Sequence, residues 1–318
     1  MIVTVTPNPS LDRAIALDGP LETGEVQRAT GDRQDAGGKG INVSRALAAA
    51  GLDTVALFPA AMTDPFIRLV EGSGVAARAV PVTGRVRSNI TLVDPSGTTT
   101  KINLPGDASV AAAAELILAE IVDAAADASW LVLAGSLPPG LSDDFFARVT
   151  HAVRERWGAD APRIAVDTSG APLRGAVEAH PDLIKPNGEE LAELLGDEPG
   201  DDAEHPAVAL ERARRLVPER VGAALVTLGS RGALYVDADT ALFAPAPKIT
   251  VRSTVGAGDS SLAGFLIADG GHPAARLSSA VAYGAAAASL PGTQTPTPAD
   301  ASMLVTVTDW TAGPPAGL

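Results

Sequence analysis

The alternation of short apolar runs with helical segments constrains the fold of this chain more than any other feature of its sequence. Runs such as residues 130–135 (WLVLAG) and 223–229 (AALVTLG) are apolar throughout, which is typical of strands that helices cover on both faces. Between such runs lie segments with helical spacing of apolar residues, for example 143–158 and 188–196. The pattern predicts an α/β fold with a doubly wound, mostly parallel sheet flanked by helices. We expect one domain over residues 1–318, although this length also permits two.

Two segments break the alternation. Residues 89–103 form a pair of alternating runs around Asp94-Pro-Ser-Gly, which predicts a β-hairpin. Residues 14–38 give short strands separated by turns, without a helical period. We expect segments at approximately 14–36 and 85–104 to form a small β-sheet inserted within the main domain. Such a sheet serves either as a lid or as a dimer surface, and the sequence favours neither.

Charge and composition exclude several classes of partner. A net charge of −14 argues against binding to nucleic acid, because such proteins need an excess of Lys and Arg at the contact surface. The absence of cysteine excludes disulfides and thiolate chemistry. Four acidic residues interrupt the apolar stretch 111–130, which predicts an amphipathic helix and no membrane partner. The chain begins with a strand-like run and no signal peptide, so we predict a cytoplasmic protein.

Common catalytic signatures are missing from the sequence. It contains no Walker-type phosphate loop, no G-x-S-x-G motif and no histidine spacing that suits a metal, and the sequence GAGDSS lacks the third glycine of a dinucleotide fingerprint. Polar motifs instead follow the predicted strands, as GSLPPG, DTSG, KPNGEE and LGSRG. Ligands of doubly wound folds bind beyond the carboxyl ends of the strands, so we expect the site at that edge.

Asp259 follows a turn of small residues directly in front of a helical pattern. Residues 253–265 read STVGAGDSSLAGF, and Leu262, Phe265 and Leu266 share one face of the predicted helix. Asp259 is therefore predicted to lie at the helix N-terminus, where it would either cap the helix by accepting a backbone N–H or act as a base beside an anion-stabilising turn. This stretch alone leaves both interpretations open.

A second glycine-rich stretch, AGGKGINVSRAL, precedes another predicted helix. Gly37, Gly38 and Gly40 permit close backbone approach, Lys39 supplies a cation, and Asn42 can hydrogen-bond a polyol. The alternative is a strained turn that only begins a helix.

Two further positions have both a structural and a functional interpretation. Asp12 follows the first strand, where it accepts sugar hydroxyls or stabilises a turn. Asn187 and Glu190 form a capping-box pattern. The same two side chains also suit Mg²⁺, which keeps several waters and takes few protein ligands.

Taken together, these motifs resemble the ribokinase-like carbohydrate kinases, the phosphofructokinase B family. The resemblance covers essentially the whole chain and is closest to the branch of 1-phosphofructokinases and tagatose-6-phosphate kinases. The stretches that carry it are NPSLD, AGGKGINVSRALAAAG, GSLPPG, DTSGAPLR, IKPNGEEL, VTLGSRGAL and STVGAGDSSLAGF.

The resemblance implies a site residue by residue. Asp259 is the implied base, beside an anion hole formed by the N–H groups of Gly256, Ala257 and Gly258. The implied contacts to the sugar hydroxyls are Asp12, Gly38 and Asn42, and those on or near its phosphate are Lys39, Arg87 and Lys101. The implied nucleotide contacts are Lys185, Asn187, Thr227, Gly229 and Gly232, with Asn187 and Glu190 near Mg²⁺. The family also implies ATP as phosphoryl donor, and it allows a monovalent cation and a homodimer through the small sheet.

Departures from the family pattern bear on the substrate. Residues 59–69 lack paired glycines that relatives often carry, Leu104 stands where an acidic or amide residue is frequent, and Ser261 replaces a bulkier residue. Glu25 and Gln27 occupy a stretch that is basic in fructose-6-phosphate kinases, and Lys39 is a residue that those enzymes lack. The resemblance therefore implies phosphorylation of fructose 1-phosphate at its 6-hydroxyl. Tagatose 6-phosphate is the alternative substrate, and a non-catalytic sugar-phosphate-binding regulator is the alternative class.

Overall fold

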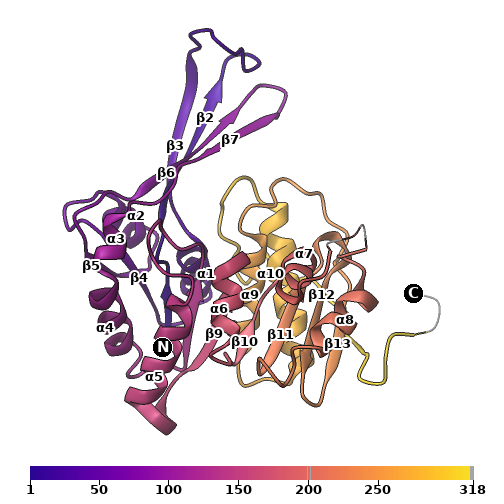
Figure 1. Ribbon diagram of the computed structural model, residues 1–318. Coiled ribbons are helices and arrows are strands. Elements are labelled where there is room, and N and C mark those ends of the chain that lie inside the picture. The colour runs from indigo at the N-terminus through magenta and orange to yellow at the C-terminus, as the bar shows by residue number, and fades with distance from the viewer. Residues whose placement is uncertain (199, 201, 316–318) are drawn as a thin grey trace.

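The central element of the computed structural model, which describes residues 1–198, 200 and 202–315, is a ten-stranded sheet (Figure 1). Each strand pairs in parallel with its neighbour from β5 across to β11. The other three pairings, β11–β12, β12–β13 and β13–β14, are antiparallel. In spatial order the strands are β14 (Thr308–Asp309), β13 (Ala241–Ala244), β12 (Ala233–Asp237), β11 (Ala223–Thr227), β10 (Leu183–Ile184), β9 (Arg163–Asp167), β8 (Trp130–Ala134), β1 (Ile2–Val5), β4 (Thr54–Ala60) and β5 (Ala76–Pro81). The predicted doubly wound, mostly parallel sheet is confirmed.

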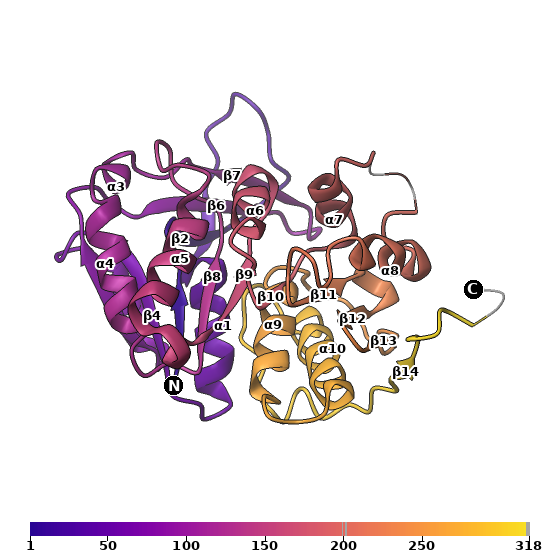
Figure 2. The same ribbon diagram turned by 60° about the horizontal axis from the view of Figure 1, so that its bottom comes forward.

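Helices cover both faces of this sheet. One layer contains α1 (Lys39–Ala49), α2 (Phe66–Gly72), α9 (Ala257–Ile267) and α10 (Pro273–Ser289), and in it α9 and α10 pack side by side (Figure 2). The other layer contains α4 (Ala114–Ala124), which follows the short α3 (Ser109–Ala112), and then α5 (Phe145–Trp157), α6 (Gly170–Val177), α7 (Gly188–Leu195) and α8 (Pro206–Arg214). Two 3-10 turns lie at Gly158–Asp160 and Gly229–Arg231.

Strand β8 shows why the strands are apolar throughout. Leu131 and Leu133 pack into the core under α4 and α5, whereas Trp130 and Val132 pack into the core under α1 and α9. Alternate side chains point to opposite faces of a strand, so a strand covered twice must be apolar at every position. In the part of the chain that the structure describes, no helix has both the length and the apolarity to span a bilayer.

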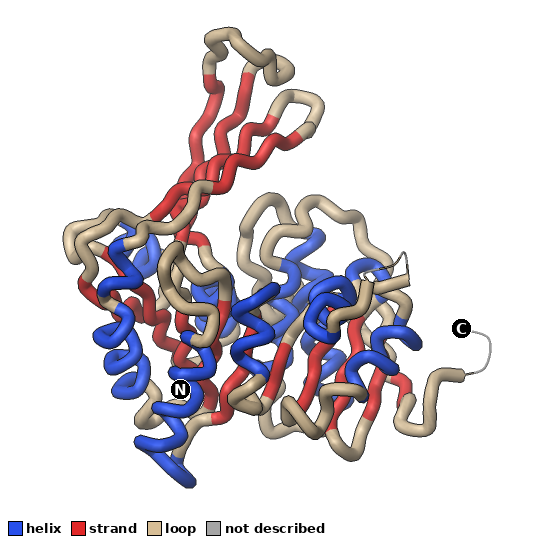
Figure 3. The backbone as a smooth tube through the Cα atoms, in the orientation of Figure 1, coloured by secondary structure: helices blue, strands red, loops and turns tan. Residues whose placement is uncertain are grey.

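The two segments that break the alternation of strands and helices form a second sheet of four strands, called the small sheet below. Its strands, in spatial order, are β3 (Ala29–Gly37), β2 (Ser10–Leu17), β6 (Arg87–Val93) and β7 (Thr99–Asn103). The predicted hairpin is the antiparallel pair β6–β7, and β2 joins it to β3. The small sheet projects away from the body of the molecule (Figure 3). At its base Ser10 pairs with Gly37, directly before α1 begins.

Candidate active site

A cavity of about 850 Å³ lies beyond the carboxyl ends of parallel strands of the large sheet. It is bounded by the residues that follow β10 and β11, by the first turn of α9 and by one side of α10. All predicted nucleotide contacts line it, namely Lys185, Asn187, Thr227, Gly229 and Gly232. Lys39, Glu190, Ala257, Gly258 and Asp259 line it as well. The structure therefore gathers at one edge residues that the sequence spreads over 220 positions from Lys39 to Asp259.

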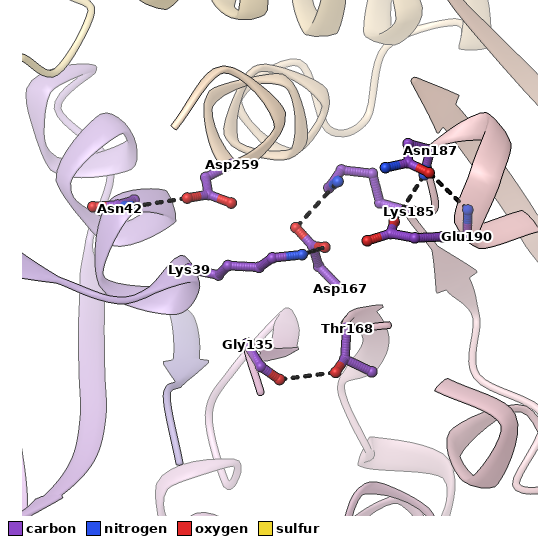
Figure 4. Close-up of polar contacts among 9 residues, drawn as sticks. All are labelled: Lys39, Asn42, Gly135, Asp167, Thr168, Lys185, Asn187, Glu190 and Asp259. Carbon is purple, nitrogen blue, oxygen red and sulfur yellow. Dashed lines mark hydrogen bonds and ion pairs between the residues drawn. The ribbon is translucent and has the colours of Figure 1, made fainter. Parts of the chain in front are cut away.

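Asp259 lies in the first turn of α9, as predicted, and is 7% exposed. The helix begins after Gly256, whose φ of 77° falls in the left-handed region that favours glycine. No side chain caps this N-terminus. The Asp259 carboxylate instead accepts a hydrogen bond from Asn42 on α1, with 2.8 Å between Nδ2 and Oδ2 (Figure 4). A capping role for Asp259 is therefore not what the structure shows, although its charge still faces the positive end of the helix.

The surroundings of Asp259 shift its proton affinity. Burial raises the pKa of Asp259, and the negative charge of Asp167 raises it further, to about 6. The hydrogen bond from Asn42 opposes the rise, as do the positive charges of Lys39 and Lys185. A carboxylate of this kind is ionised at neutral pH and accepts a proton far more readily than an exposed aspartate.

Asp167 is a central residue of the site that sequence analysis did not select. It ends β9 and is fully buried. Its Oδ1 accepts from Lys39 Nζ at 2.8 Å, and its Oδ2 lies 3.3 Å from Lys185 Nζ (Figure 4). Burial alone would raise the pKa of Asp167, but the charges of Lys185 and Lys39 lower it overall. The motif DTSG after a strand was the signal that pointed here.

Lys39 and Lys185 thus meet at one carboxylate. Lys39 is the first residue of α1, and Lys185 directly follows β10. Burial lowers the pKa of Lys39, but the charge and hydrogen bond of Asp167 outweigh this effect and raise the pKa overall. Lys39 is therefore held as a cation on the wall of the cavity, and Lys185 lies on the same wall, against the other oxygen of Asp167.

Asn187 and Glu190 form the predicted capping box at the start of α7. The Glu190 backbone N donates to Asn187 Oδ1 at 2.7 Å, and the Asn187 backbone N donates to Glu190 Oε2 at 2.9 Å. Both side chains also line the cavity. Within residues 1–198, 200 and 202–315 no group of three or more His, Cys, Asp or Glu side chains is placed to hold a metal ion.

The residues implied for the sugar hydroxyls lie on β2 of the small sheet and at the start of α1. Asp12 on β2 accepts from Ser10 Oγ at 2.8 Å and from Asn89 Nδ2 at 3.0 Å. Burial raises the pKa of Asp12 above its usual range. Gly38, with φ 129°, precedes α1, and a Cβ at this position would come within 2.6 Å of Thr6 Cγ2. Only glycine suits this turn.

The remaining two candidates belong to the small sheet and do not line the cavity. Arg87 begins β6 and donates from Nη1 to the Leu104 carbonyl at 3.0 Å. Burial lowers the pKa of Arg87, and the charge of Asp12 opposes that shift. Lys101 is exposed on β7, opposite Thr91. The predicted phosphate contacts are therefore dispersed, in contrast to the nucleotide contacts.

Comparison with known proteins agrees with this arrangement. The family model described as pfkB family carbohydrate kinase matches residues 6–300. The 1-phosphofructokinase of Xanthomonas campestris pv. campestris is 36% identical over 273 residues, which cover 84% of this chain and 83% of that protein. The ATP-dependent 6-phosphofructokinase isozyme 2 of Mycobacterium tuberculosis is 34% identical over 270 residues, with 84% and 77% covered.

A solved structure extends the likeness to the fold. The tetrameric inhibited form of phosphofructokinase-2 from Escherichia coli superimposes with a TM-score of 0.85 at 28% identity, over 95% of this chain and 96% of that one. The match of the family model to most of the chain, together with a buried carboxylate at a helix N-terminus beside a cation-lined cavity, shows that the chain belongs to the pfkB family of carbohydrate kinases.

Proposed function

We propose that this sugar kinase transfers the γ-phosphoryl group of ATP to the 6-hydroxyl of fructose 1-phosphate, giving fructose 1,6-bisphosphate and ADP. The observation that carries the proposal is the position of Asp259, which is buried, accepts from Asn42 on one side and faces the cavity on the other. A hydroxyl held near Asn42 would meet both the base and the phosphoryl donor. A protein that only binds sugar phosphates has no use for such a base, and this argues against the regulator.

In the proposed reaction Asp259 removes the proton from the attacking hydroxyl. The sugar oxygen then bonds to the γ-phosphorus as the bond to the β–γ bridging oxygen breaks, and ADP leaves. Phosphoryl transfer depends chiefly on positioning and on stabilisation of charge. A raised pKa of about 6 makes Asp259 a competent acceptor near neutral pH.

The first turn of α9 provides donors for the charge on the transferring group. Its first i to i−4 hydrogen bond runs from Ser260 N to Gly256 O, so the amides of Gly258 and Asp259 before it have no partner within the helix. The Ala257 amide lies 3.3 Å from the Thr254 carbonyl and donates to it. We therefore assign more of the anion hole to Gly258 than to Ala257, with Gly256, the residue before the helix, as the third member that the family implies.

The cavity fits a nucleotide with Mg²⁺. Its volume suits a ligand of this size, and Lys185 supplies a cation beside the turn. Thr227, Gly229 and Gly232 line the same cavity. Asn187 and Glu190 would hold Mg²⁺ largely through its waters. Their capping box already occupies the side-chain oxygen of Asn187 and one carboxylate oxygen of Glu190. When bound, Mg²⁺ neutralises phosphate charge.

The substrate assignment depends on the sugar side of the site. Asp12, Gly38 and Asn42 would contact the hydroxyls, and Arg87 and Lys101 the phosphate, with Lys39 near the junction of the two substrates. The small sheet would then act as a lid. A homodimer through this sheet and a requirement for a monovalent cation remain predictions. Relatives named for phosphorylation of either fructose phosphate are nearly equally similar, so the substrate needs a direct test.

The test is the formation of ADP with Mg-ATP and each of four acceptors, namely fructose 1-phosphate, tagatose 6-phosphate, fructose 6-phosphate and fructose. We expect kcat/KM to be highest for fructose 1-phosphate, with fructose 1,6-bisphosphate as product. A preference for tagatose 6-phosphate or fructose 6-phosphate would overturn the substrate assignment but keep the kinase. Binding of the sugars without turnover would favour the regulator.

A further inference from the structure

We propose that Asp167 is a positioning residue for phosphoryl transfer, which fixes the Lys39 and Lys185 ammonium groups side by side at the transfer point. This inference rests on the proposed kinase function and assigns a residue that neither the motif analysis nor the family match selects. Asp167 does not itself line the cavity, whereas both lysines do. It would act on the phosphates only through them.

The geometry joins three separate parts of the fold. Asp167 ends β9 in the centre of the sheet, Lys39 opens α1 in one helical layer, and Lys185 follows β10. The two ammonium groups lie 2.8 and 3.3 Å from different oxygens of the same carboxylate. Lys185 Nζ also lies 3.3 Å from the point that a Cβ on Gly258 would occupy, so this ammonium abuts the turn that begins α9.

Electrostatics explains why an acid is needed at this position. Two ammonium groups held together in a poorly solvated site repel each other, and a carboxylate between them removes most of that repulsion. The cluster of Asp167, Lys39 and Lys185 keeps one net positive charge, which suits an incoming phosphate. Asp167 is fully buried and Lys185 is only 5% exposed, whereas the Lys39 side chain is 34% exposed, so water screens the contact of Asp167 with Lys185 the least.

Stability is a weaker explanation for the same cluster. Buried ion pairs contribute little net stability compared with apolar residues of similar size, because desolvation offsets their attraction. Apolar side chains such as Ile164 and Val166 already fill the core around β9. A charged cluster at the rim of a cavity is better explained by what the cavity binds.

Asp167 also acts on Asp259 through space. The groups that face Asp259 are Asn42 and Lys39 from α1, Asp167 from β9 and Lys185, which directly follows β10. Among them Asp167 carries the only negative charge, which opposes ionisation of Asp259. Its neutralisation should therefore make Asp259 a weaker base that titrates at lower pH.

The experiment uses Asp167→Asn in the full chain. We expect the KM for ATP, and its Kd measured by calorimetry, to rise about tenfold or more, on the scale of one lost charged contact. We also expect the acid limb of kcat/KM to move about one pH unit lower, on the scale of a neighbouring charge. Substrate phosphates titrate identically in both proteins, so the difference between the two profiles belongs to the enzyme.

A matched control separates this effect from a general loss of charge. Asp182→Asn removes a carboxylate that is ion-paired with Arg154 and accepts from the Ile164 amide, at the opposite end of the same strands. Its kinetics should match the wild type. In addition, the effect of Asp167→Asn on ATP affinity should shrink in a Lys39→Met background, because the two positions act through one contact.

Each outcome decides a separate question. Unchanged ATP affinity and an unmoved acid limb in a folded Asp167→Asn protein would overturn the proposal. If this variant does not fold, Asp167→Glu keeps the charge and displaces it by one methylene, and an ATP KM equal to that of the wild type would then overturn the proposal. If the wild type phosphorylates no sugar, the proposed function fails, and the ATP Kd still tests Asp167.

Discussion

The two sides of the site are built differently. On the nucleotide side Lys185, Asp167 and Asp259 are all less than 10% exposed, and they are connected to Lys39 and Asn42 by short polar contacts. On the side of the small sheet Lys101 is exposed, and Arg87 contacts the backbone carbonyl of Leu104, which directly follows β7.

The difference shows which part of the reaction the fold prepares in advance. Charge stabilisation at the phosphoryl group requires fixed groups that do not reorganise during reaction, and in the proposed reaction the buried nucleotide side would provide them. In the proposed reaction, recognition of the sugar phosphate would fall to the projecting small sheet, where movement is least costly because few contacts tie this sheet to the core. Catalytic power and substrate choice should therefore respond to different substitutions.

The largest expected effect comes from Asp259→Asn. This variant removes the proton acceptor and keeps the shape of the side chain, so kcat should fall by about 10²-fold or more, on the scale of a lost general base. Kd values for ATP and fructose 1-phosphate should stay near those of the wild type. Turnover close to the wild-type rate would remove Asp259 from the role of base and leave the buried side without a catalytic function.

A smaller effect, confined to the sugar, should follow from Arg87→Ala. Arg87 is partly buried beside Asp12, so we expect loss of its contact to raise the KM for the phosphosugar about tenfold, with little change in kcat or in the KM for ATP. Steady-state kinetics with either substrate varied separates these parameters. If KM is unchanged, Arg87 does not bind the phosphate.

The smallest effect is expected for Lys101→Ala. An exposed cation is screened by water and salt, so the KM for the phosphosugar should rise less than about threefold, and the rise should disappear at high ionic strength. A change as large as that of Arg87→Ala would mean that the small sheet closes over the substrate far enough to bury Lys101.

Features set by neighbouring residues could be predicted from the sequence, whereas contacts between distant residues could not. The strand pattern, the hairpin, the capping box at Asn187 and the helix N-terminus at Asp259 depend on residues close together in the chain, and the structure contains them all. The contact of Asp167 with Lys39 spans 128 residues, and no local periodicity encodes it. The partner of a buried charge is set by tertiary packing, and so Asp167 was missed.

The measurement that tests the central claim most directly is the ratio of kcat/KM for wild type to that for Asp259→Asn, followed from pH 5 to pH 8. Substrate phosphates, whose pKa also lies near 6, titrate in both proteins and cancel in this ratio. Because Asp259 must be deprotonated to act and its pKa is raised to about 6, the ratio should be constant above that pH and fall about tenfold per unit below it. A ratio that stays constant over the whole range would contradict the assignment of Asp259 as the buried base of a sugar kinase.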